Sequence, residues 1–556
     1  MTTLQFTNII SSDILIHSEK SSLPLIDIGE DEYFGILKTN IDKTRMVKTP
    51  TLIKFTIDKT GSMNEQQTRK TTKMDYVVQT FISMMEYLSK LDAEIFVQVN
   101  TFNITVDELV QCVRITSDNL DEMINKIKSI RADESTDIGL ALGKANEELA
   151  QYAEENPEHQ IGHIFMTDGD QTRNVKTVSE LTELVKTKYN NILVGFGIDH
   201  NADLLSNMAD KKNAEYKFVD NMENTSLVYG ETVHKFIYPA LRNVEFRIEN
   251  GKLYDWTKNE WTDCLYEDVI IGEAEKVYHI KTTDTSNVLV SIHGSLASLP
   301  VTVEITDFDK EFMLLDTAIP IPDLVTIATG DIISNDLTKY AFRQKVQELL
   351  FRAKSIKYDS ITCFKTELRD AFRTIRKYMR MNLLLNDGLL KMLCDDIVIT
   401  YRTIGMHHGR AFAVARQTSQ GRQQTYNTGS SQASNKSDTV DLQRQNALGP
   451  DMFDFVPSTP RPVLQRMNTI SPRVADERFS ASLPNSDDEL KVDTFTKYDE
   501  RGFFHPPASV FKNIFEDDNY LPEDEMEYYL PSTNDTTCYA TPAVLQTMRS
   551  MSKRNP

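Results

Sequence analysis

The sequence is poor in the features from which disulfide frameworks, zinc modules and membrane spans are built. Its cysteines are few and far apart, whereas disulfide-rich and zinc-binding domains need several at short spacing. No stretch approaches the roughly 20 apolar residues of a membrane-spanning helix, and residues 1–17 lack the basic flank and apolar core of a signal peptide. We therefore expect an intracellular, cytoplasmic protein without membrane contact. The cysteines, which we interpret as structural thiols, are Cys112, Cys264, Cys363, Cys394 and Cys538.

Basic charge is also scarce. The chain has 61 lysines and arginines against 82 aspartates and glutamates, which gives a formal net charge of -21. Because phosphate backbones attract clustered Lys and Arg, this balance opposes nucleic-acid binding. The sequence also lacks the phosphate-binding pattern G-x-x-x-x-G-K, the nucleophile pattern G-x-S-x-G, and a histidine paired by its context with a nucleophile. We therefore expect no enzymatic activity.

Strand and helix patterns alternate between residues 51 and 236. Residues 51–58 form a continuous apolar run typical of a buried strand, and the apolar residues that follow recur at helical spacing. Such alternation predicts an α/β fold with a doubly wound, mostly parallel sheet covered by helices. We expect strands at 51–58, 94–102, 104–115 (antiparallel, at the sheet edge), 163–167, 191–197 and 215–219, and helices at 74–91, 118–130, 137–152, 176–189, 202–208 and up to residue 236.

The length and the changes of composition predict several domains. At 556 residues the chain is too long for one core, since domains usually have about 100 to 200 residues. Beyond residue 239 short apolar and polar runs alternate, with turn signals at Asn250-Gly251 and His293-Gly294. We predict an N-terminal β segment (1–48) that pairs with the later β region, an α/β domain (49–239), an antiparallel β-sandwich-like domain (240–330), a helical region (331–415) and a largely disordered tail (416–556).

Oxygen-bearing side chains follow the predicted strands at three places. Asp58 and Asp168 each come at the end of a strand, so both carboxylates should project from the same edge of the sheet. Thr136 lies at the predicted N-cap of a helix that begins at that edge. Carboxylates and hydroxyls are the ligands that hard cations such as Mg²⁺ or Mn²⁺ prefer. The predicted metal ligands are Asp58, Thr60, Ser62, Thr136 and Asp168.

These segments resemble a known family. DKTGSM at residues 58–63, STDIGLAL at 135–142 and FMTDGD at 165–170 resemble the metal-ion-dependent adhesion site of von Willebrand factor A domains. The family's first motif, usually D-x-S-x-S, maps onto Asp58, Thr60 and Ser62, its threonine onto Thr136, and its later aspartate onto Asp168. The resemblance covers residues 50–239. It implies a domain that binds a protein partner whose acidic side chain completes the shell of the metal ion.

Two departures from the family pattern stand near the ligands. Thr60 replaces the more common serine, which keeps the hydroxyl and adds a methyl group. Glu134-Ser135 replaces glycines that often precede the threonine. Neither change removes a ligand. Among the neighbours, we interpret Asp137 and Asp170 as residues around the ligands or at the surface, Lys59 as solvent-facing and His163 as a packing position in a strand.

The flanks resemble a narrower group. Residues 32–38, 265–268 and 409–426 are similar to segments of eukaryotic A-domain proteins that carry a RING finger and act as ubiquitin ligases. No paired Cys and His ligands precede Asp58, so ligase activity cannot be transferred to this chain. Similar A-domain proteins occur in protists and large DNA viruses; for a viral protein, the virion is the alternative location.

Three functions therefore compete. The first is a metal-dependent protein-binding module. The second is a scaffold or structural component that recruits partners through the tail, where Thr459-Pro460, Ser471-Pro472 and Thr541-Pro542 are candidate sites for proline-directed phosphorylation. The third, and weakest, is a metal-dependent hydrolase, for which the sequence offers no catalytic motif.

Overall fold

The computed structural model describes residues 10–17, 25–26, 29, 31–47, 49–66, 71–169, 172–174, 176–197, 200–219, 225–297, 319–328, 337–406, 408–424, 497–498, 504–505, 525–531 and 538–552. The chain forms two compact units, Met1–Ser434 with Tyr529–Pro556, and Asn435–Tyr528. In the second unit the described elements are the antiparallel pair β16 (Lys497–Tyr498) and β17 (Phe504–His505) and the helix α15 (Glu525–Tyr528). Everything below concerns the first unit.

A six-stranded, mostly parallel sheet forms the centre of the α/β domain. Its strand order is β5-β4-β3-β6-β7-β8, and only the edge strand β5 runs antiparallel to its neighbour. Every residue of β3 is buried, as its apolar sequence predicts for a central strand covered on both faces. The predicted α/β fold is thus confirmed. The strands are β3 (Thr51–Asp58), β4 (Ile95–Phe102), β5 (Val106–Arg114), β6 (Gln160–Thr167), β7 (Asn190–Phe196) and β8 (Ala214–Val219).

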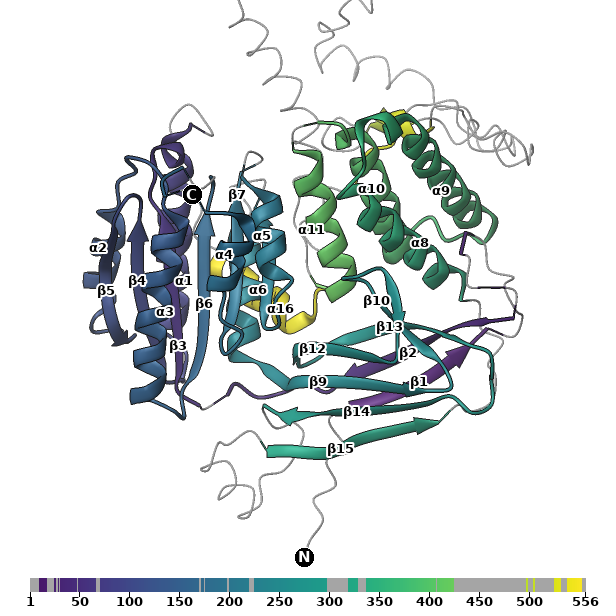
Figure 1. Ribbon diagram of the computed structural model, residues 1–556, viewed down its shortest axis with the longest axis horizontal. Coiled ribbons are helices and arrows are strands. Elements are labelled where there is room, and N and C mark those ends of the chain that lie inside the picture. The colour runs from purple at the N-terminus through teal and green to yellow at the C-terminus, as the bar shows by residue number, and fades with distance from the viewer. Residues whose placement is uncertain are drawn as a thin grey trace, which may run out of the picture. The chain divides into compact units, whose positions relative to one another are not determined.

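Helices cover both faces of this sheet (Figure 1). On one face Phe81 of α1, Ile127 of α2 and Phe236 of α6 pack in one core with β-strand side chains. On the other face Leu142 of α3 and Leu205 of α5 belong to a second core. Successive side chains of a strand point to opposite faces of the sheet, so the apolar strands contribute side chains to both cores. The helices are α1 (Lys73–Leu88), α2 (Leu120–Lys128), α3 (Ile138–Glu155), α4 (Val178–Leu184, shorter than predicted), α5 (Ala202–Ala209) and α6 (Thr225–Ile237).

Two antiparallel sheets share another core, to which Leu37, Phe246 and Ile292 belong. One has the order β1-β2-β13-β10-β11 and the other β12-β9-β14-β15. The N-terminal strand β2 pairs with β13, so the first residues of the chain and those after the α/β domain build one sheet. The strands are β1 (Ile10–Ile16), β2 (Tyr33–Ile41), β9 (Pro239–Glu249), β10 (Lys252–Asp255), β11 (Glu260–Thr262), β12 (Cys264–Ile271), β13 (Glu275–Thr282), β14 (Leu289–Leu296) and β15 (Ile319–Ala328).

One of the two predicted turns in this region is wrong. Asn250-Gly251 does lie between two strands, β9 and β10, and Asn250 adopts a φ of 59°. His293-Gly294, in contrast, lies inside β14, where the register shifts against both neighbouring strands. Glycine is found at such bulges as well as in turns, because both need an irregular backbone, and the sequence does not separate the two cases.

The helical region contains α8 (Thr338–Ala353), α9 (Ile361–Met381), α10 (Gly388–Thr403) and α11 (Gly409–Arg422). α11 continues past residue 415, where we expected the tail to begin. Phe412 of α11 packs edge-on against Phe218 of β8, with ring centroids 5.3 Å apart. This contact joins the helical region to the core of the α/β domain. None of the described helices is long and apolar enough to cross a membrane.

The helix α16 (Pro542–Ser552) near the C-terminus packs on α6 and α1. Thr541 precedes it and is buried, and its Oγ1 accepts a hydrogen bond from Val544 N at 3.2 Å. A candidate phosphorylation site therefore serves here as a buried helix cap. Thr459-Pro460 and Ser471-Pro472 lie outside the described residues.

Candidate functional site

Asp58 and Asp168 lie at the same edge of the sheet because β3 and β6 are parallel neighbours. Asp58 is the last residue of β3, and Asp168 directly follows the last residue of β6. The register pairs Ile57 with Met166, so the two strand ends are level. Asp58 is 0% exposed and Asp168 is 3% exposed. Two carboxylates removed from water thus meet at the carboxyl edge, where open α/β sheets bind their ligands.

Hydroxyl groups link these two carboxylates. Asp58 accepts hydrogen bonds from Thr60 N at 2.8 Å and from Thr167 Oγ1 at 2.5 Å. The hydroxyls of Thr60 and Ser62 are 3.0 Å apart, and Ser62 Oγ donates to Asp168 Oδ1 at 2.6 Å. The short 3₁₀ helix η2 (Gly61–Asn64) turns the chain so that Ser62 faces Asp168. Asp58, Thr60, Ser62 and Asp168 therefore form one connected set of oxygens.

Thr136 reaches the same place from the loop before α3. A Cβ atom on Gly169 would lie 3.7 Å from Thr136 Oγ1 and 3.8 Å from Ser62 Oγ, so both hydroxyls border the backbone next to Asp168. Thr172 holds this loop, because its Oγ1 accepts a hydrogen bond from Thr136 N at 2.9 Å. Gly61 N also donates to Glu134 O at 2.9 Å. The structure thus brings together all the residues that we predicted as metal ligands.

The loop before α3 differs in detail from the prediction. The N-cap of α3 is Asp137 rather than Thr136, because Asp137 Oδ1 accepts the hydrogen bond from Leu140 N. Asp137 is buried and its other oxygen accepts from Asn174 Nδ2 at 2.5 Å, so it is not a surface residue. A carboxylate competes well with a hydroxyl for a helix N-cap, and the two adjacent residues could not be ranked by sequence. Glu134, where the family often has glycine, adopts a φ of 63°.

The remaining neighbours are placed as follows. Lys59 is half-buried rather than solvent-facing, because its ammonium forms an ion pair of 2.8 Å with Asp107 on β5. His163 is buried in β6, as predicted for a packing position, and its Nε2 lies 3.0 Å from Thr56 Oγ1. Asp170 lies outside the described residues.

The proximity of two buried carboxylates has an electrostatic consequence. Burial, followed by the charge of Asp168, raises the pKa of Asp58 to about 6, although the hydrogen bonds from Thr167 and Thr60 act in the opposite direction. The hydrogen bonds to Asp58 therefore do not fully compensate for its burial beside a second carboxylate. A cation at this position would remove that imbalance.

One residue of the site was missed by sequence reasoning. Lys73, the first residue of α1, is buried, and its Nζ lies 2.9 Å from Asp168 Oδ2 and 2.7 Å from Glu65 Oε2. Burial opposes its charge, but the two carboxylates outweigh burial and raise the pKa of Lys73. The adhesion-site pattern contains no lysine, and Lys73 lies outside the DKTGSM segment. No sequence signal pointed to it.

The set of donors fits a hard divalent cation. It consists of two carboxylates and three hydroxyls, all oxygen, which suits Mg²⁺ or Mn²⁺ better than the nitrogen and sulfur ligands of structural zinc. Within the described ranges, no cluster of three or more His, Cys, Asp or Glu side chains offers an alternative metal site. A metal ion here would depend on Asp58, Thr60, Ser62, Thr136 and Asp168.

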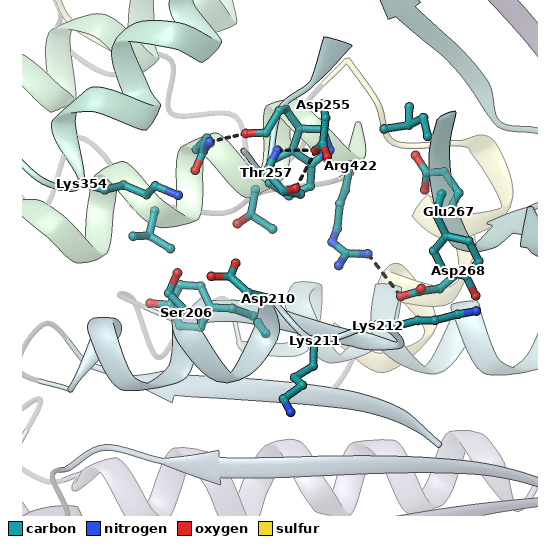
Figure 2. Close-up of a pocket in the computed structure, with 18 residues that line it drawn as sticks. Ser206, Asp210, Lys211, Lys212, Asp255, Thr257, Glu267, Asp268, Lys354 and Arg422 are labelled. Atoms are coloured by element: carbon teal, nitrogen blue, oxygen red, sulfur yellow. Dashed lines mark hydrogen bonds and ion pairs between the residues drawn. The ribbon is translucent and has the colours of Figure 1, made fainter. Parts of the chain in front are cut away.

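Away from this site, a cavity of about 330 Å³ is bordered by α5, α11 and the strands β8, β10 and β12. Figure 2 shows Lys354 and Asp210 pointing into it, and the ion pair between Arg422 and Asp268 at its wall, with 3.7 Å between Nη1 and Oδ2. Acidic and basic side chains alternate around it, so its charge selects no class of ligand. The Asp58 site has the more specific chemistry.

Residues 53–230 match the family model of the von Willebrand factor type A domain. The chain therefore contains a domain of this family, which typically serves in adhesion or protein binding and is generally non-catalytic. The match does not include residues 32–38, 265–268 or 409–426, and the expected similarity of these segments to RING-containing ligases stays a prediction. No curated protein matches the chain in sequence.

Several solved structures are similar to this chain at low sequence identity. A von Willebrand factor type A protein from Catenulispora acidiphila has 13% identity and a TM-score of 0.46, over 71% of this chain and 91% of that one. The ArnB paralog VWA2 from Sulfolobus acidocaldarius has 14% identity and a TM-score of 0.43, over 74% of this chain and 97% of that one. Proximal thread matrix protein 1 from the mussel byssus, whose structure has a zinc-occupied MIDAS motif, has 18% identity and a TM-score of 0.27. The similarity covers 32% of this chain and 46% of that one. None of these similarities bears on the ligands of the present chain.

Proposed function

We propose that the A domain of this chain is a metal-dependent protein-binding module. A Mg²⁺ or Mn²⁺ ion held by Asp58, Thr60, Ser62, Thr136 and Asp168 would capture an acidic side chain of a partner protein. When bound, the ion supplies an open coordination position for that carboxylate. The observation that carries the proposal is the pair of buried carboxylates, Asp58 and Asp168, linked through Thr60 and Ser62 at one edge of the sheet.

The residues of the chain have distinct roles in this proposal. Asp58 and Asp168 provide the negative charge, and their burial keeps water from screening it. Thr167 and the backbone N–H of Thr60 fix the orientation of the Asp58 carboxylate. The hydroxyls leave the net charge of the site low, so that an acidic partner is attracted to the ion rather than repelled by its ligands.

The alternative is recruitment through the C-terminal residues. It is favoured by the acidic composition of the chain and by the length of chain between α11 and α16. In that case the A domain would be a scaffold, and partner recovery would not depend on a metal ion.

Affinity purification of the full chain from a lysate tests the proposal. Partners should be recovered in MgCl₂ or MnCl₂ and lost in EDTA, and Asp58→Ala should lose them in either metal. Asp121→Ala is the matched control, because Asp121 is an exposed aspartate of α2 outside the site. Recovery by Asp58→Ala at the wild-type level, with loss on internal removal of residues 435–524, which lie in the second unit and leave α16 in place, would favour the scaffold instead.

A further inference from the structure

The side chain of Lys73 is in direct contact with a predicted metal ligand. Its Nζ lies 2.9 Å from Asp168 Oδ2, and the two side chains are 4% and 0% exposed. Ser62 Oγ donates to the other oxygen of Asp168 at 2.6 Å. Both oxygens of Asp168 are therefore engaged, one by a neutral hydroxyl and one by an ammonium.

The position of Lys73 is fixed by its surroundings. Its backbone N donates to Glu65 O at 3.0 Å, which ties the start of α1 to the residue that follows η2. The capping box of Thr72 and Asp75 holds the start of α1. Gly197 leaves room for the lysine side chain: a Cβ atom there would lie 3.2 Å from Lys73 Cε and 3.3 Å from Nζ.

Lys73 also has a second carboxylate within reach. Glu65 Oε2 lies 2.7 Å from Nζ, and the side chain of Glu65 is 55% exposed. An ammonium that leaves Asp168 can thus remain paired while it moves toward solvent. A buried charge without a partner would be far more costly, so Glu65 gives the lysine an alternative that Asp168 alone does not.

We propose that Lys73 is an internal competitor of the metal ion, whose ammonium occupies Asp168 in the metal-free domain and lowers the affinity of the site for divalent cations. This inference rests on the proposed metal-dependent function. A divalent cation and the ammonium repel each other, and both require the same carboxylate. Metal binding then includes the transfer of Lys73 from Asp168 to Glu65. The metal-free domain keeps a neutralised Asp168, and the site fills only at a higher metal concentration.

Calorimetric titration of the full chain with MnCl₂ tests this. Lys73→Met removes the charge at nearly constant volume, and Lys73→Gln also keeps a hydrogen-bond donor for Asp168. Both variants should bind Mn²⁺ more tightly than the wild type, with a dissociation constant lower by about tenfold, because the repulsion between the ammonium and the ion is removed. Lys73→Arg keeps the charge and should stay within about threefold of the wild type. Equal or weaker binding by both neutral variants would overturn the inference.

The same titrations separate this inference from the proposed function. If the wild type binds Mn²⁺ and neither neutral variant binds more tightly, only the role of Lys73 fails. If the neutral variants bind Mn²⁺ and the wild type does not, Lys73 excludes the ion from the wild-type site. The role of Lys73 is then supported, and the proposed metal-dependent function fails. If no protein binds, both fail. Thermal unfolding in EDTA identifies a variant that does not fold. If one neutral variant fails to fold, the Mn²⁺ affinity of the other neutral variant tests the role of Lys73.

Discussion

Gly230 of α6 lies directly against the backbone of Met548 in α16, so close that a Cβ atom on the glycine would be 3.1 Å from Met548 Cα. One turn further along α6, His234 Nδ1 lies 2.9 Å from Thr547 Oγ1, a residue 313 positions away in the chain. Met551 of α16 belongs to the same apolar core as Phe81 of α1. The C-terminal helix is therefore part of the packing of the A domain.

Substitution of Gly230 should loosen α16. In Gly230→Ala the new methyl group meets the backbone of Met548, which cannot move without shifting the helix, and overpacking of this kind costs about 1 to 3 kcal/mol. The gain in helix propensity offsets about 1 kcal/mol of that cost. We expect faster hydrogen exchange in residues 542–552 and a lower melting temperature, measured by mass spectrometry and thermal unfolding.

Gly143 of α3 provides the matched control. It also lies inside a helix, but a Cβ atom there would meet nothing within 4 Å. Gly143→Ala should therefore stabilise the protein by about 0.5 to 1 kcal/mol through helix propensity alone. If both glycine variants are stabilised equally, and exchange in residues 542–552 is unchanged, α16 does not depend on close approach to α6.

The sequence predicted the A-domain sheet well because its strands and helices differ clearly in period. The buried run of β3, the antiparallel edge strand β5 and the helix α3 lie where their patterns placed them. The convergence of Asp58 and Asp168 also followed from sequence, because parallel strands end at one edge. Thr136 could be added because its loop begins the helix that reaches this edge. Metal occupancy itself stays a prediction.

Contacts between distant segments could not be predicted. Lys73 and Asp168 come from different elements, and α16 meets α6 across more than half of the chain, so neither contact leaves a periodic pattern or a motif in the sequence. The short apolar pattern of α16 lies in a polar region and does not by itself require a helix, since its stability depends on packing with α6. The bulge in β14 also could not be predicted, because glycine occurs both in turns and in bulges.

Metal ions should stabilise the wild-type domain. A cation that binds the folded state alone adds about 2.7 kcal/mol when its concentration is a hundred times its dissociation constant. We expect MnCl₂, at about a hundred times the dissociation constant measured by calorimetry, to raise the melting temperature by a few degrees. Asp58→Ala should abolish this shift and Asp121→Ala should keep it. An identical shift in Asp58→Ala would place the metal elsewhere.

The two partners of a buried ion pair should respond unequally to mutation. Lys54 in β3 has a side chain that is 0% exposed, and its Nζ lies 2.5 Å from Glu148 Oε2 of α3. Glu148→Gln leaves the buried ammonium without its ion-pair partner, with only the more distant charge of Glu108 remaining, and should cost about 3 kcal/mol. Lys54→Met should cost less, because Glu148 keeps Asn100 as a hydrogen-bond donor at 2.7 Å and borders solvent.

Urea and thermal unfolding at neutral pH measure both costs, and the double variant Lys54→Met with Glu148→Gln completes the cycle. The double variant should be more stable than Glu148→Gln alone, because it removes the uncompensated charge. A larger loss in Lys54→Met than in Glu148→Gln would mean that the packing of the lysine stem, rather than its charge, dominates at this position.

Stability should fall at mildly acidic pH through the buried histidines, of which His163 is the clearest. Burial, followed by the charge of Lys54, lowers the pKa of His163 from 6.5 to about 3, so the folded protein keeps this ring neutral. The unfolded chain takes up a proton below pH 6.5 and the folded chain does not. The free energy of unfolding therefore decreases as the pH falls from 6.5 toward 3, by up to about 1.4 kcal/mol per pH unit for this group.

His163→Gln isolates this contribution. The amide can still meet the hydroxyl of Thr56, which lies 3.0 Å from His163 Nε2, but it does not titrate. The variant should lose stability at pH 7.5 through imperfect packing, yet its free energy of unfolding should decline less steeply than that of the wild type between pH 6.5 and 5. Urea unfolding at several pH values gives the slope of the free energy of unfolding against pH for each protein. Carboxylates elsewhere contribute equally to both slopes, so their contribution cancels when the two slopes are subtracted. Parallel slopes would show that His163 takes up a proton in the folded protein, which would require the β6 core around it to admit water or to open.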